Sequence, residues 1–392
     1  MIRRLARKGL FYWTSVIFLV VGGVFAGHWL ERQDVATALR YRAYQFVTHG
    51  AASRKPYSTQ TVAVLVGDEE FWKGGLARRT PTKRDYLGQI VRALDEADAS
   101  AIALDFDLRW PDPSGSPLPY HDYDGETQKL LEAVRDVSKN RPVILSRTIR
   151  WEAGHYIHEP DLYDNFDFQG GAVRGGHVLL PFDVRRVPLS VELKDGTQVN
   201  SFAEALVRQV NAKALEPVEG LEEAPYGSYL TVADFPIFPA GALLARDREV
   251  MESVRHKIVI VGAAWSMQAF GRGLRVDTHV TPVGPMPGAL VHANFVEALL
   301  DRRTAPAWSE RALMTFDAGL AFSVAIIFAL IQRLRWKLAA LLALCAGVVM
   351  FSILSWLNLG LFYDFFIPVV LVIGHAFYEE ARERFGKKEA HA

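Results

Sequence analysis

The sequence has only one cysteine, Cys345, in a chain of 392 residues. A single thiol cannot form an intrachain disulfide, and it excludes a zinc site built from several cysteines. An excess of charge of either sign is also missing, because 44 basic residues stand against 44 acidic ones. A balanced chain has no general attraction to a polyanion, so the composition argues against nucleic acid as a partner.

Three sequence patterns are missing as well. The chain has no internal repeat, no low-complexity run that divides residues 31–310, and no Gly-x-Ser-x-Gly nucleophile motif. We therefore expect residues 31–310 to form one domain and the protein not to be an enzyme. Nothing in the sequence predicts a cofactor.

Long apolar runs lie near the two ends of the chain. About 20 apolar residues in a helix cross the roughly 30 Å apolar core of a bilayer. The runs predict four transmembrane helices, over residues 9–30, 311–332, 337–357 and 359–377. A cleaved signal peptide is the alternative for the first run, since basic residues precede it and Val24-Phe25-Ala26 resembles a cleavage site.

Basic residues fall on one side of these predicted spans. They occur in residues 1–8, in the turn with Arg333 and Arg335, and in the tail at residues 378–392. Short segments rich in Lys and Arg stay in the cytoplasm. We therefore expect a multi-pass membrane protein with both termini in the cytoplasm and residues 31–310 outside.

The central domain alternates strand-like runs with helical patterns. Residues 61–67 and 101–104 predict buried strands, and the helical spacing over residues 81–97 between them completes a βαβ unit. A last strand over residues 257–262 precedes a final amphipathic helix. The pattern predicts an α/β domain with a mostly parallel sheet flanked by helices.

Several short motifs follow one another over about 240 residues. They are VAVLVGD, a helix start with Pro81 and Arg84, IALDFD, an Arg-x-x-Pro segment at Arg185 and Pro188, NSFAEAL, KIVIVG and HANFVEALL. In this order the motifs resemble the CHASE2 family, an extracytoplasmic sensory domain of bacterial membrane proteins. The layout of one apolar run before the domain and three after it resembles the family too.

The chain departs from this family in three places. Asp183-Val184 replaces the usual Asp-Gly before the Arg-x-x-Pro segment, and residues 150–176 match no part that we recognise. Many members carry a cyclase, kinase or phosphatase domain after the last span, whereas about 15 residues follow it here. The resemblance therefore implies a sensor without catalytic output, acting through a separate partner subunit.

Acidic residues follow two of the predicted strands, at the sheet edge where ligands of open α/β folds bind. Asp68 follows the first strand, and Asp105 and Asp107 follow the second. Three hypotheses stay open for them. They cap helices or pair with Arg84, they contact a ligand, or they bind Mg²⁺ in a metal-dependent hydrolase.

A second group of candidates lies near the start of the final helix. Its members are Asp277, Thr281, His292 and Asn294. His292 and Asn294 suit hydrogen bonding to a polar or anionic ligand at a helix N-terminus. The alternative is that the group satisfies buried backbone atoms in a tight loop.

Two further groups of polar residues have a functional hypothesis beside the simpler one of chance spacing. Metal ligands are one hypothesis for His155, His158 and His177, although their spacing matches no standard site. A proton path is one hypothesis for Asp317, Asp364 and His375, although all three fall near the ends of predicted spans.

The leading hypothesis for function is a membrane-anchored sensor. An unknown small ligand or envelope protein binds outside, and a partner in the membrane or cytoplasm carries the response; a homodimer is compatible with this arrangement. The first alternative is a structural or assembly subunit of an envelope complex, which would show a large apolar patch and no polar pocket. The second, an extracytoplasmic metal-dependent hydrolase, requires Asp68, Asp105 and Asp107 to meet within metal-binding distance.

Overall fold

The chain divides into two compact units. The first comprises Met1–Arg40 and Ala307–Ala392, and the second comprises Tyr41–Pro306. The computed structural model describes residues 10–31, 33–50, 57–76, 78–79, 81–109, 123–219, 223–225, 229–267, 275–304, 310–331, 333–359, 374 and 378.

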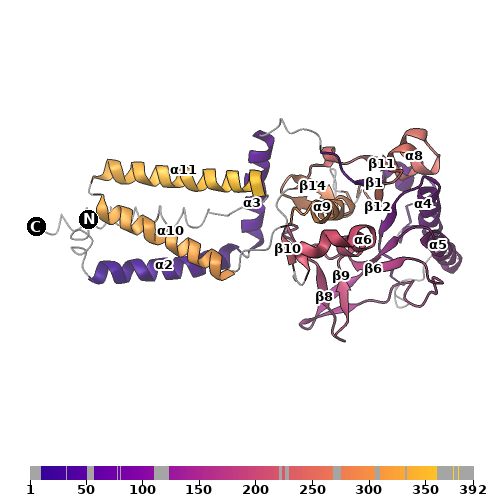
Figure 1. The fold of residues 1–392 in the computed structure, drawn as a ribbon, viewed down its shortest axis with the longest axis horizontal. Coiled ribbons are helices and arrows are strands. Elements are labelled where there is room, and N and C mark those ends of the chain that lie inside the picture. Colours follow the sequence, from indigo (N-terminus) through magenta and orange to yellow (C-terminus); the bar gives the residue numbers. More distant parts are fainter. Residues whose placement is uncertain are drawn as a thin grey trace, which may run out of the picture. The chain divides into compact units, whose positions relative to one another are not determined.

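The described part of the first unit is helical (Figure 1). Its helices are α2 (Leu10–Glu31), the start of α3 (Asp34–Gly50), α10 (Glu310–Leu330) and α11 (Leu334–Leu359). α2 packs against α10, where Val16 and Ala325 are buried together. A contact of 3.3 Å between His28 Nε2 and Asp317 Oδ2 joins the same two helices.

The prediction of four transmembrane helices is wrong. Among the described residues, no helix combines the length and the apolar content that crossing a membrane requires. Glu310, Arg311 and Asp317 lie in α10, and Arg335 and Lys337 lie in the first turn of α11. The prediction rests on composition along the chain, whereas a span needs an uninterrupted apolar length of about 30 Å.

Part of that prediction concerns residues outside the described part of the chain. The fourth predicted span, residues 359–377, lies there apart from residues 359 and 374. The two predicted cytoplasmic ends, residues 1–8 and 378–392, lie there apart from residue 378.

A six-stranded parallel sheet forms the centre of the second unit. In spatial order its strands are β11 (Ile237–Pro239), β1 (Thr61–Val66), β12 (Ile258–Ala263), β2 (Ala101–Asp105), β3 (Val143–Arg147) and β6 (Val173–His177). β1 and β12 are buried at every position, as strands covered on both faces must be. The predicted α/β domain with a parallel sheet flanked by helices is confirmed.

Helices cover both faces of this sheet (Figure 1). One layer consists of α4 (Arg84–Glu96), α5 (Tyr123–Ser138), α7 (Ala240–Leu244) and α8 (Arg248–Val254), and the other of α6 (Phe202–Asn211) and α9 (Gly288–Leu300). Side chains alternate between the layers along each strand. Val62 and Val64 of β1 join the α4 cluster, whereas Ala63 joins the α6 and α9 cluster.

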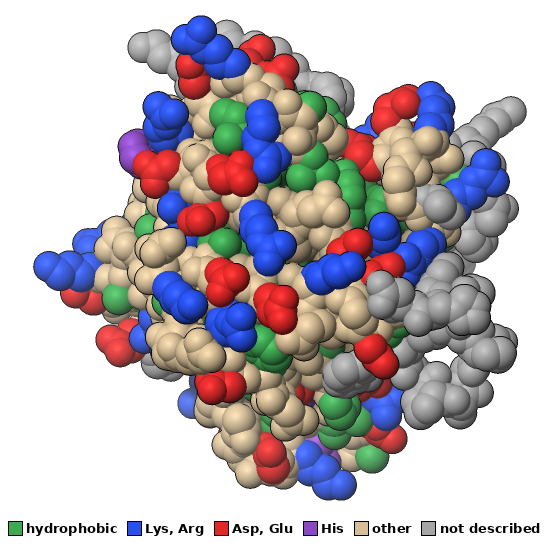
Figure 2. Space-filling model, turned by 90° about the vertical axis from the view of Figure 1, so that its right-hand side faces the viewer, with side chains coloured by type: hydrophobic (Ala, Val, Ile, Leu, Met, Phe, Trp, Pro, Cys, Tyr) green, Lys and Arg blue, Asp and Glu red, His purple; other side chains and the backbone are tan. Residues whose placement is uncertain are grey.

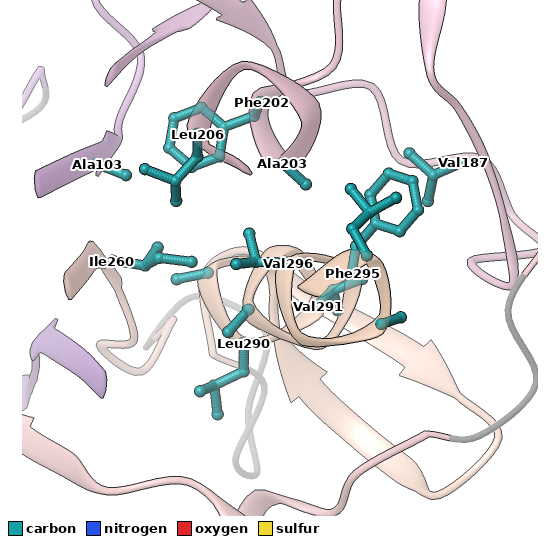
Figure 3. Close-up of a cluster of buried hydrophobic side chains, with 14 of the residues drawn as sticks. Ala103, Val187, Phe202, Ala203, Leu206, Ile260, Leu290, Val291, Phe295 and Val296 are labelled. Atoms are coloured by element: carbon teal, nitrogen blue, oxygen red, sulfur yellow. The ribbon is translucent and has the colours of Figure 1, made fainter. Parts of the chain in front are cut away.

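The core between α6 and α9 fixes the position of α9 against the sheet. Figure 3 shows side chains of these two helices, among them Phe202, Leu206 and Val296, directed toward one another beside Ala103 and Ile260 of the strands. The α6 helix begins directly after Ser201, whose side chain accepts a hydrogen bond from the Glu204 backbone N–H at 3.1 Å. This is an N-cap interaction.

Short elements surround the main sheet. Four antiparallel pairs are β4 (Ile149–Glu152) with β5 (His155–His158), β7 (Arg186–Pro188) with β10 (Glu223–Pro225), β8 (Ser190–Glu192) with β9 (Gln198–Asn200), and β13 (Thr278–Thr281) with β14 (Gly284–Pro287). Short helices of other types are η1 (Glu69–Lys73), a π-helix, and η2 (Ala212–Val218) and η3 (Val232–Asp234), which are 3-10 helices. Residues 150–176, which the sequence left without a match, contain most of the β4–β5 hairpin and the start of β6.

The strand order creates a switch point in the middle of the sheet. β12 lies between β1 and β2, although α4 connects β1 to β2 directly along the chain. The chain leaves β1 toward α4 on one face, and it leaves β12 toward α9 on the other face. Ligands of open α/β sheets bind at the carboxyl ends of the strands at such a point.

Candidate functional site

A cleft of about 1200 Å³ lies at the carboxyl ends of β2 and β12. The end of β2, the start of α4, the β4–β5 hairpin, the loop after β12, β13 and α9 all contribute to its walls. Five of the eight predicted site residues line it, namely Arg84, Asp105, Asp107, Asp277 and His292.

Asp105 is the last residue of β2 and points an unpaired oxygen into this region. Its Oδ2 is buried and has no hydrogen-bond partner among the described residues. Burial, and after it the charge of Asp277, raise the pKa of the Asp105 carboxyl well above its usual range. This side chain therefore demands a proton or a positive charge.

Asp277 directly precedes β13 in the chain, and its carboxylate lies against the first turn of α9. Its backbone has a φ of 53°, and its carbonyl accepts a hydrogen bond of 2.8 Å from the Gly288 N–H. A Cβ at Gly288 would lie 2.1 Å from Asp277 Oδ2, so only glycine leaves room for this carboxylate on the first turn of the helix. The other oxygen, Oδ1, lies 3.0 Å from His279 Nε2.

His292 faces the cleft from the second turn of α9. The residue is 3 % exposed, and its ring packs against Phe202 with centroids 5.1 Å apart. Its ring nitrogens make no hydrogen bond with any part of the chain that the structure describes. Burial lowers the pKa of His292 to about 4, so the ring is neutral at pH 7 and one of its nitrogens is an acceptor.

We call Asp105, Asp277 and His292 the acid end of the cleft. The close approach of α9 to β12 assembles it, and Gly262 of β12 allows that approach. A Cβ at Gly262 would lie 2.5 Å from the Ala289 Cβ. No side chain larger than hydrogen fits between strand and helix without moving one of them.

The opposite part of the cleft is a closed network of ion pairs, which we call the arginine cluster. Its members are Arg84, Asp107, Arg109 and Glu159. Arg109 donates to Asp107 through Nε at 2.8 Å and Nη2 at 2.6 Å, and it also pairs with Glu159. Burial opposes the ionisation of Asp107, but the hydrogen bonds from Arg109 outweigh it and lower the Asp107 pKa.

Arg84 lies beneath this cluster and is 1 % exposed. Its guanidinium donates to Thr127 Oγ1 at 2.7 Å and to the Arg109 carbonyl at 2.6 Å, and it lies 4.0 Å from the centre of the Tyr123 ring. Burial lowers the Arg84 pKa to about 10. The contacts make Arg84 a support for the loop after β2.

The other three predicted residues do not line the cleft. Asp68 accepts hydrogen bonds from the Ser266 N–H at 2.6 Å and the Ser266 hydroxyl at 2.7 Å, and these bonds lower its pKa. Thr281 donates to the Gly284 carbonyl within the β13–β14 turn. Asn294 accepts from the Leu230 N–H at 2.7 Å and donates to the Leu290 carbonyl at 3.2 Å.

The hypothesis that His155, His158 and His177 bind a metal together is not supported, because only His158 lies in a group with suitable geometry among the described residues. His158 Nε2 lies 2.9 Å from Asp161 Oδ2 and 3.6 Å from Asp164 Oδ2, in a geometry that suits a metal ion. Arg147 already pairs with both carboxylates, at 3.6 Å to Asp161 and 2.8 Å to Asp164. His155 and His177 are not part of that group.

The proton-path residues are described only in part. Asp317 pairs with His28. Asp364 and His375 lie outside the described residues.

Arg109, Glu159 and Trp265 are among the cleft residues that the sequence did not predict. Arg109 and Glu159 close the arginine cluster, and Trp265 forms part of the wall after β12. The spacing Asp107-x-Arg109 is a signal for the first of these, because a side chain two residues away reaches the same carboxylate across a turn. Glu159 comes from a hairpin far along the chain, and no local pattern indicates it.

Comparison with known proteins gives one match. The model of the CHASE2 domain family matches residues 15–332. No curated protein and no solved structure matches the chain. The family match covers most of the chain and both layers of the α/β domain, and CHASE2 domains are extracytoplasmic sensory domains. The family predicted from the order of the motifs is confirmed, and the chain belongs to the CHASE2 family.

Proposed function

We propose that this protein is an extracytoplasmic sensor. Its Tyr41–Pro306 unit binds a small ligand at the acid end of the cleft, and a separate partner subunit carries the response. The proposal rests on which charged side chains of the cleft already have a partner. The arginine cluster is internally neutralised, whereas Asp105 keeps a buried oxygen without a partner. Buried polar groups of native proteins are nearly always paired, so an unpaired one in a cleft favours a ligand.

A route for the signal begins at Asp277. This residue immediately precedes the β13–β14 hairpin, and the Thr281 carbonyl at the end of β13 accepts a hydrogen bond of 3.2 Å from Gln45 Nε2 of α3. The Tyr41 hydroxyl, one turn earlier in α3, donates to Asp183 Oδ1 at 2.9 Å. α3 is one continuous helix that begins in the first unit and ends in the second. A ligand that shifts the hairpin would therefore bias the position of α3.

The alternative of a structural or assembly subunit has less support. Over the described surface of the domain, the large exposed apolar side chains come from separate segments: Trp151, Phe182, Val210, Val232, Met267 and Val280. Figure 2 shows acidic and basic side chains interspersed over one face of the domain. A cleft lined by charged side chains, together with exposed apolar residues that come from separate segments, favours ligand binding over a broad apolar docking surface.

The hydrolase alternative has less support as well. It requires Asp68, Asp105 and Asp107 to converge, yet Asp68 is engaged by Ser266 and Asp107 by Arg109. Among the described residues, the group with metal-binding geometry consists of His158, Asp161 and Asp164. It includes none of these three carboxylates. Catalysis by a metal at the strand ends therefore finds no ligand set there.

Affinity purification of the tagged full-length chain tests the proposal. Wild type and Asp105→Asn would be purified from the host in mild detergent, and co-purifying proteins identified by mass spectrometry. We expect a protein with a signalling domain, such as a kinase or cyclase, at near-stoichiometric amount, and a change of at least threefold in that amount for Asp105→Asn. Asp195→Asn is the matched control, since Asp195 is an exposed turn residue that accepts from the Thr197 N–H.

Two results would contradict the sensor. One is the recovery of envelope-assembly proteins alone, which supports the structural subunit. The other is a signalling partner whose recovery is the same in wild type, Asp105→Asn and Asp195→Asn, because the cleft would then have no influence on the partner.

A further inference from the structure

We propose that the ligand of this cleft is an organic cation: a primary amine with an apolar body, whose ammonium group is held between Asp105 and Asp277 beside His292. The inference rests on the proposed function of the cleft as a ligand site. It adds the chemical class of the ligand and the orientation of its charged end.

The first argument is the distribution of charge along the walls. Arg109 is occupied by Asp107 and Glu159, and Arg150 is occupied by Glu152 at 2.8 Å and Glu159 at 3.1 Å. Arg84 is held by Thr127 and the Arg109 carbonyl. An anionic ligand would have to break one of these pairs to find a cation. A cationic ligand meets carboxylates that have no arginine or lysine partner among the described residues.

The second argument is the state of the two carboxyl groups. Burial, and after it the charge of Asp277, raise the Asp105 pKa, so the ionised form of Asp105 is disfavoured unless a positive charge lies beside it. An ammonium group between the two carboxyl groups supplies that charge and favours the ionised form of Asp105. Each carboxylate then accepts an N–H, and the buried Asp105 Oδ2 gains the partner that it lacks.

The third argument is the neutral imidazole of His292. Because burial lowers its pKa to about 4, the ring does not carry a charge that would repel an ammonium. It lies 3 % exposed at the cleft wall and makes no hydrogen bond within the described residues. A neutral imidazole beside two carboxylates suits a ligand that brings N–H donors and a positive charge.

The remaining walls suit a hydrocarbon body. Ile157, Val178, Leu180, Trp265 and Val276 line the same cleft. A bare divalent cation would leave this apolar surface uncovered, and it prefers several oxygen or nitrogen ligands that converge on one point. Among the described residues, such a convergence occurs at His158, Asp161 and Asp164 and not at the acid end. The walls therefore favour an amine over a metal ion.

Calorimetric titration of the purified full-length chain tests the assignment. The probes are hexylammonium chloride, 1-hexanol, sodium hexanoate and MgCl₂, at about pH 7.5, where an alkylamine is protonated. We expect hexylammonium to bind at least tenfold more tightly than hexanol, and hexanoate and Mg²⁺ not to compete with it. Asp105→Asn should weaken hexylammonium binding at least tenfold.

Asp107→Asn is the matched control. It removes the same charge two residues away in the same cleft, but from a carboxylate that Arg109 already neutralises. We expect it to change hexylammonium affinity less than threefold. Far-ultraviolet circular dichroism of each variant establishes that the fold is retained before any titration is interpreted.

Each other outcome overturns the assignment. Equal binding of hexylammonium and hexanol, or equal losses in Asp105→Asn and Asp107→Asn, would mean that the acid end does not recognise the charge. Preferential binding of hexanoate or Mg²⁺, or no binding of any probe, would also exclude the organic cation. If the amount of co-purified signalling partner still differs between wild type and Asp105→Asn in those cases, the proposed sensor function stands and only the ligand class is wrong. The two proposals can therefore fail separately.

Discussion

Asp105 and Asp107 stand two residues apart at the end of one strand, yet they lie in opposite surroundings. Asp107 receives two hydrogen bonds from the Arg109 guanidinium and one from the Arg109 backbone N–H, and its pKa is lowered. Asp105 has a buried oxygen without a described partner and faces a second carboxylate, and its pKa is raised. Identical side chains in a single DFD motif thus acquire different chemistry from their neighbours. The arginine cluster holds the loop after β2 in place, and the acid end is left to bind something else.

Removal of Arg84 should disrupt the arginine cluster and cause the largest loss of stability among these predictions. Arg84→Met deletes a fully buried cation and leaves the carbonyl of Arg109 and the charge of Asp107 without it. We expect the free energy of unfolding to fall by about 3–5 kcal/mol, as when one member of a buried charged network is removed. Urea unfolding followed by circular dichroism measures this. A loss below about 1 kcal/mol would mean that Arg84 does not support the cluster.

Substitution of Gly262 should disturb the acid end through the backbone. Gly262→Ala adds a methyl group 2.5 Å from the Ala289 Cβ and pushes α9, with His292, away from β12. We expect a loss of about 1–3 kcal/mol in the free energy of unfolding, typical of overpacking. Gly75→Ala is the control, because a Cβ there meets nothing within 4 Å. Equal unfolding midpoints for the two variants would contradict the close approach of α9.

The two aspartates should make opposite contributions to stability as pH changes. An unfolded Asp has a pKa of about 3.9. The raised folded pKa of Asp105 stabilises the fold fully below that pH, and this contribution is lost as pH rises through the folded value. The lowered folded pKa of Asp107 stabilises the fold above that pH, and this contribution is lost as pH falls through the folded value.

Urea unfolding of wild type, Asp105→Asn and Asp107→Asn between about pH 3 and 8 measures both slopes. The stability of Asp105→Asn relative to wild type should rise with pH, and that of Asp107→Asn should fall. The slope for Asp107→Asn should be the smaller one, because solvent screens its exposed ion pair with Arg109. The charge of Asp277 also acts on Asp105, and the charge of Arg84 acts on Asp107, but both residues are unchanged in both variants. If the relative stabilities of both variants changed with pH in the same direction, Asp105 and Asp107 would not have oppositely shifted pKa values.

The smallest expected effect concerns the link between the acid end and α3. Gln45→Ala removes the hydrogen bond to the Thr281 carbonyl and should cost about 1 kcal/mol or less. Hexylammonium binding should stay within about threefold of wild type, because that cost is shared by the free and bound states. Hydrogen exchange of α3 should respond to hexylammonium in wild type and not in Gln45→Ala. An identical response in both would exclude this hydrogen bond as the link.

Much of the α/β fold could be predicted from the sequence. Strands β1, β2 and β12 are buried on both faces, so each reads as an unbroken apolar run, and the Ser201 cap marks the start of α6. The order of these motifs also led to the family. The predicted transmembrane helices are wrong because composition alone does not ensure an uninterrupted apolar length within the described helices.

The site could be predicted only in part. Carboxylates that follow parallel strands often face a cleft, and this rule correctly predicts Asp105 and Asp107 as cleft residues. The same rule does not distinguish them from Asp68, which accepts hydrogen bonds from Ser266 instead. That difference depends on partners distant in the chain. Ser266 follows Asp68 by 198 positions, and Glu159 follows Arg109 by 50. Local sequence carries no information about such contacts before the fold is known.

The most direct test of the account is the titration of the Asp105 side chain itself. Carboxyl ¹³C signals of aspartate-labelled full-length protein would be followed by NMR against pH, with Asp105→Asn and Asp107→Asn to identify the two signals. The account predicts a higher midpoint for Asp105 than for Asp107, and a downward shift of the Asp105 midpoint alone on saturation with hexylammonium. Equal midpoints for the two residues, or an Asp105 midpoint that hexylammonium leaves unchanged, would contradict it.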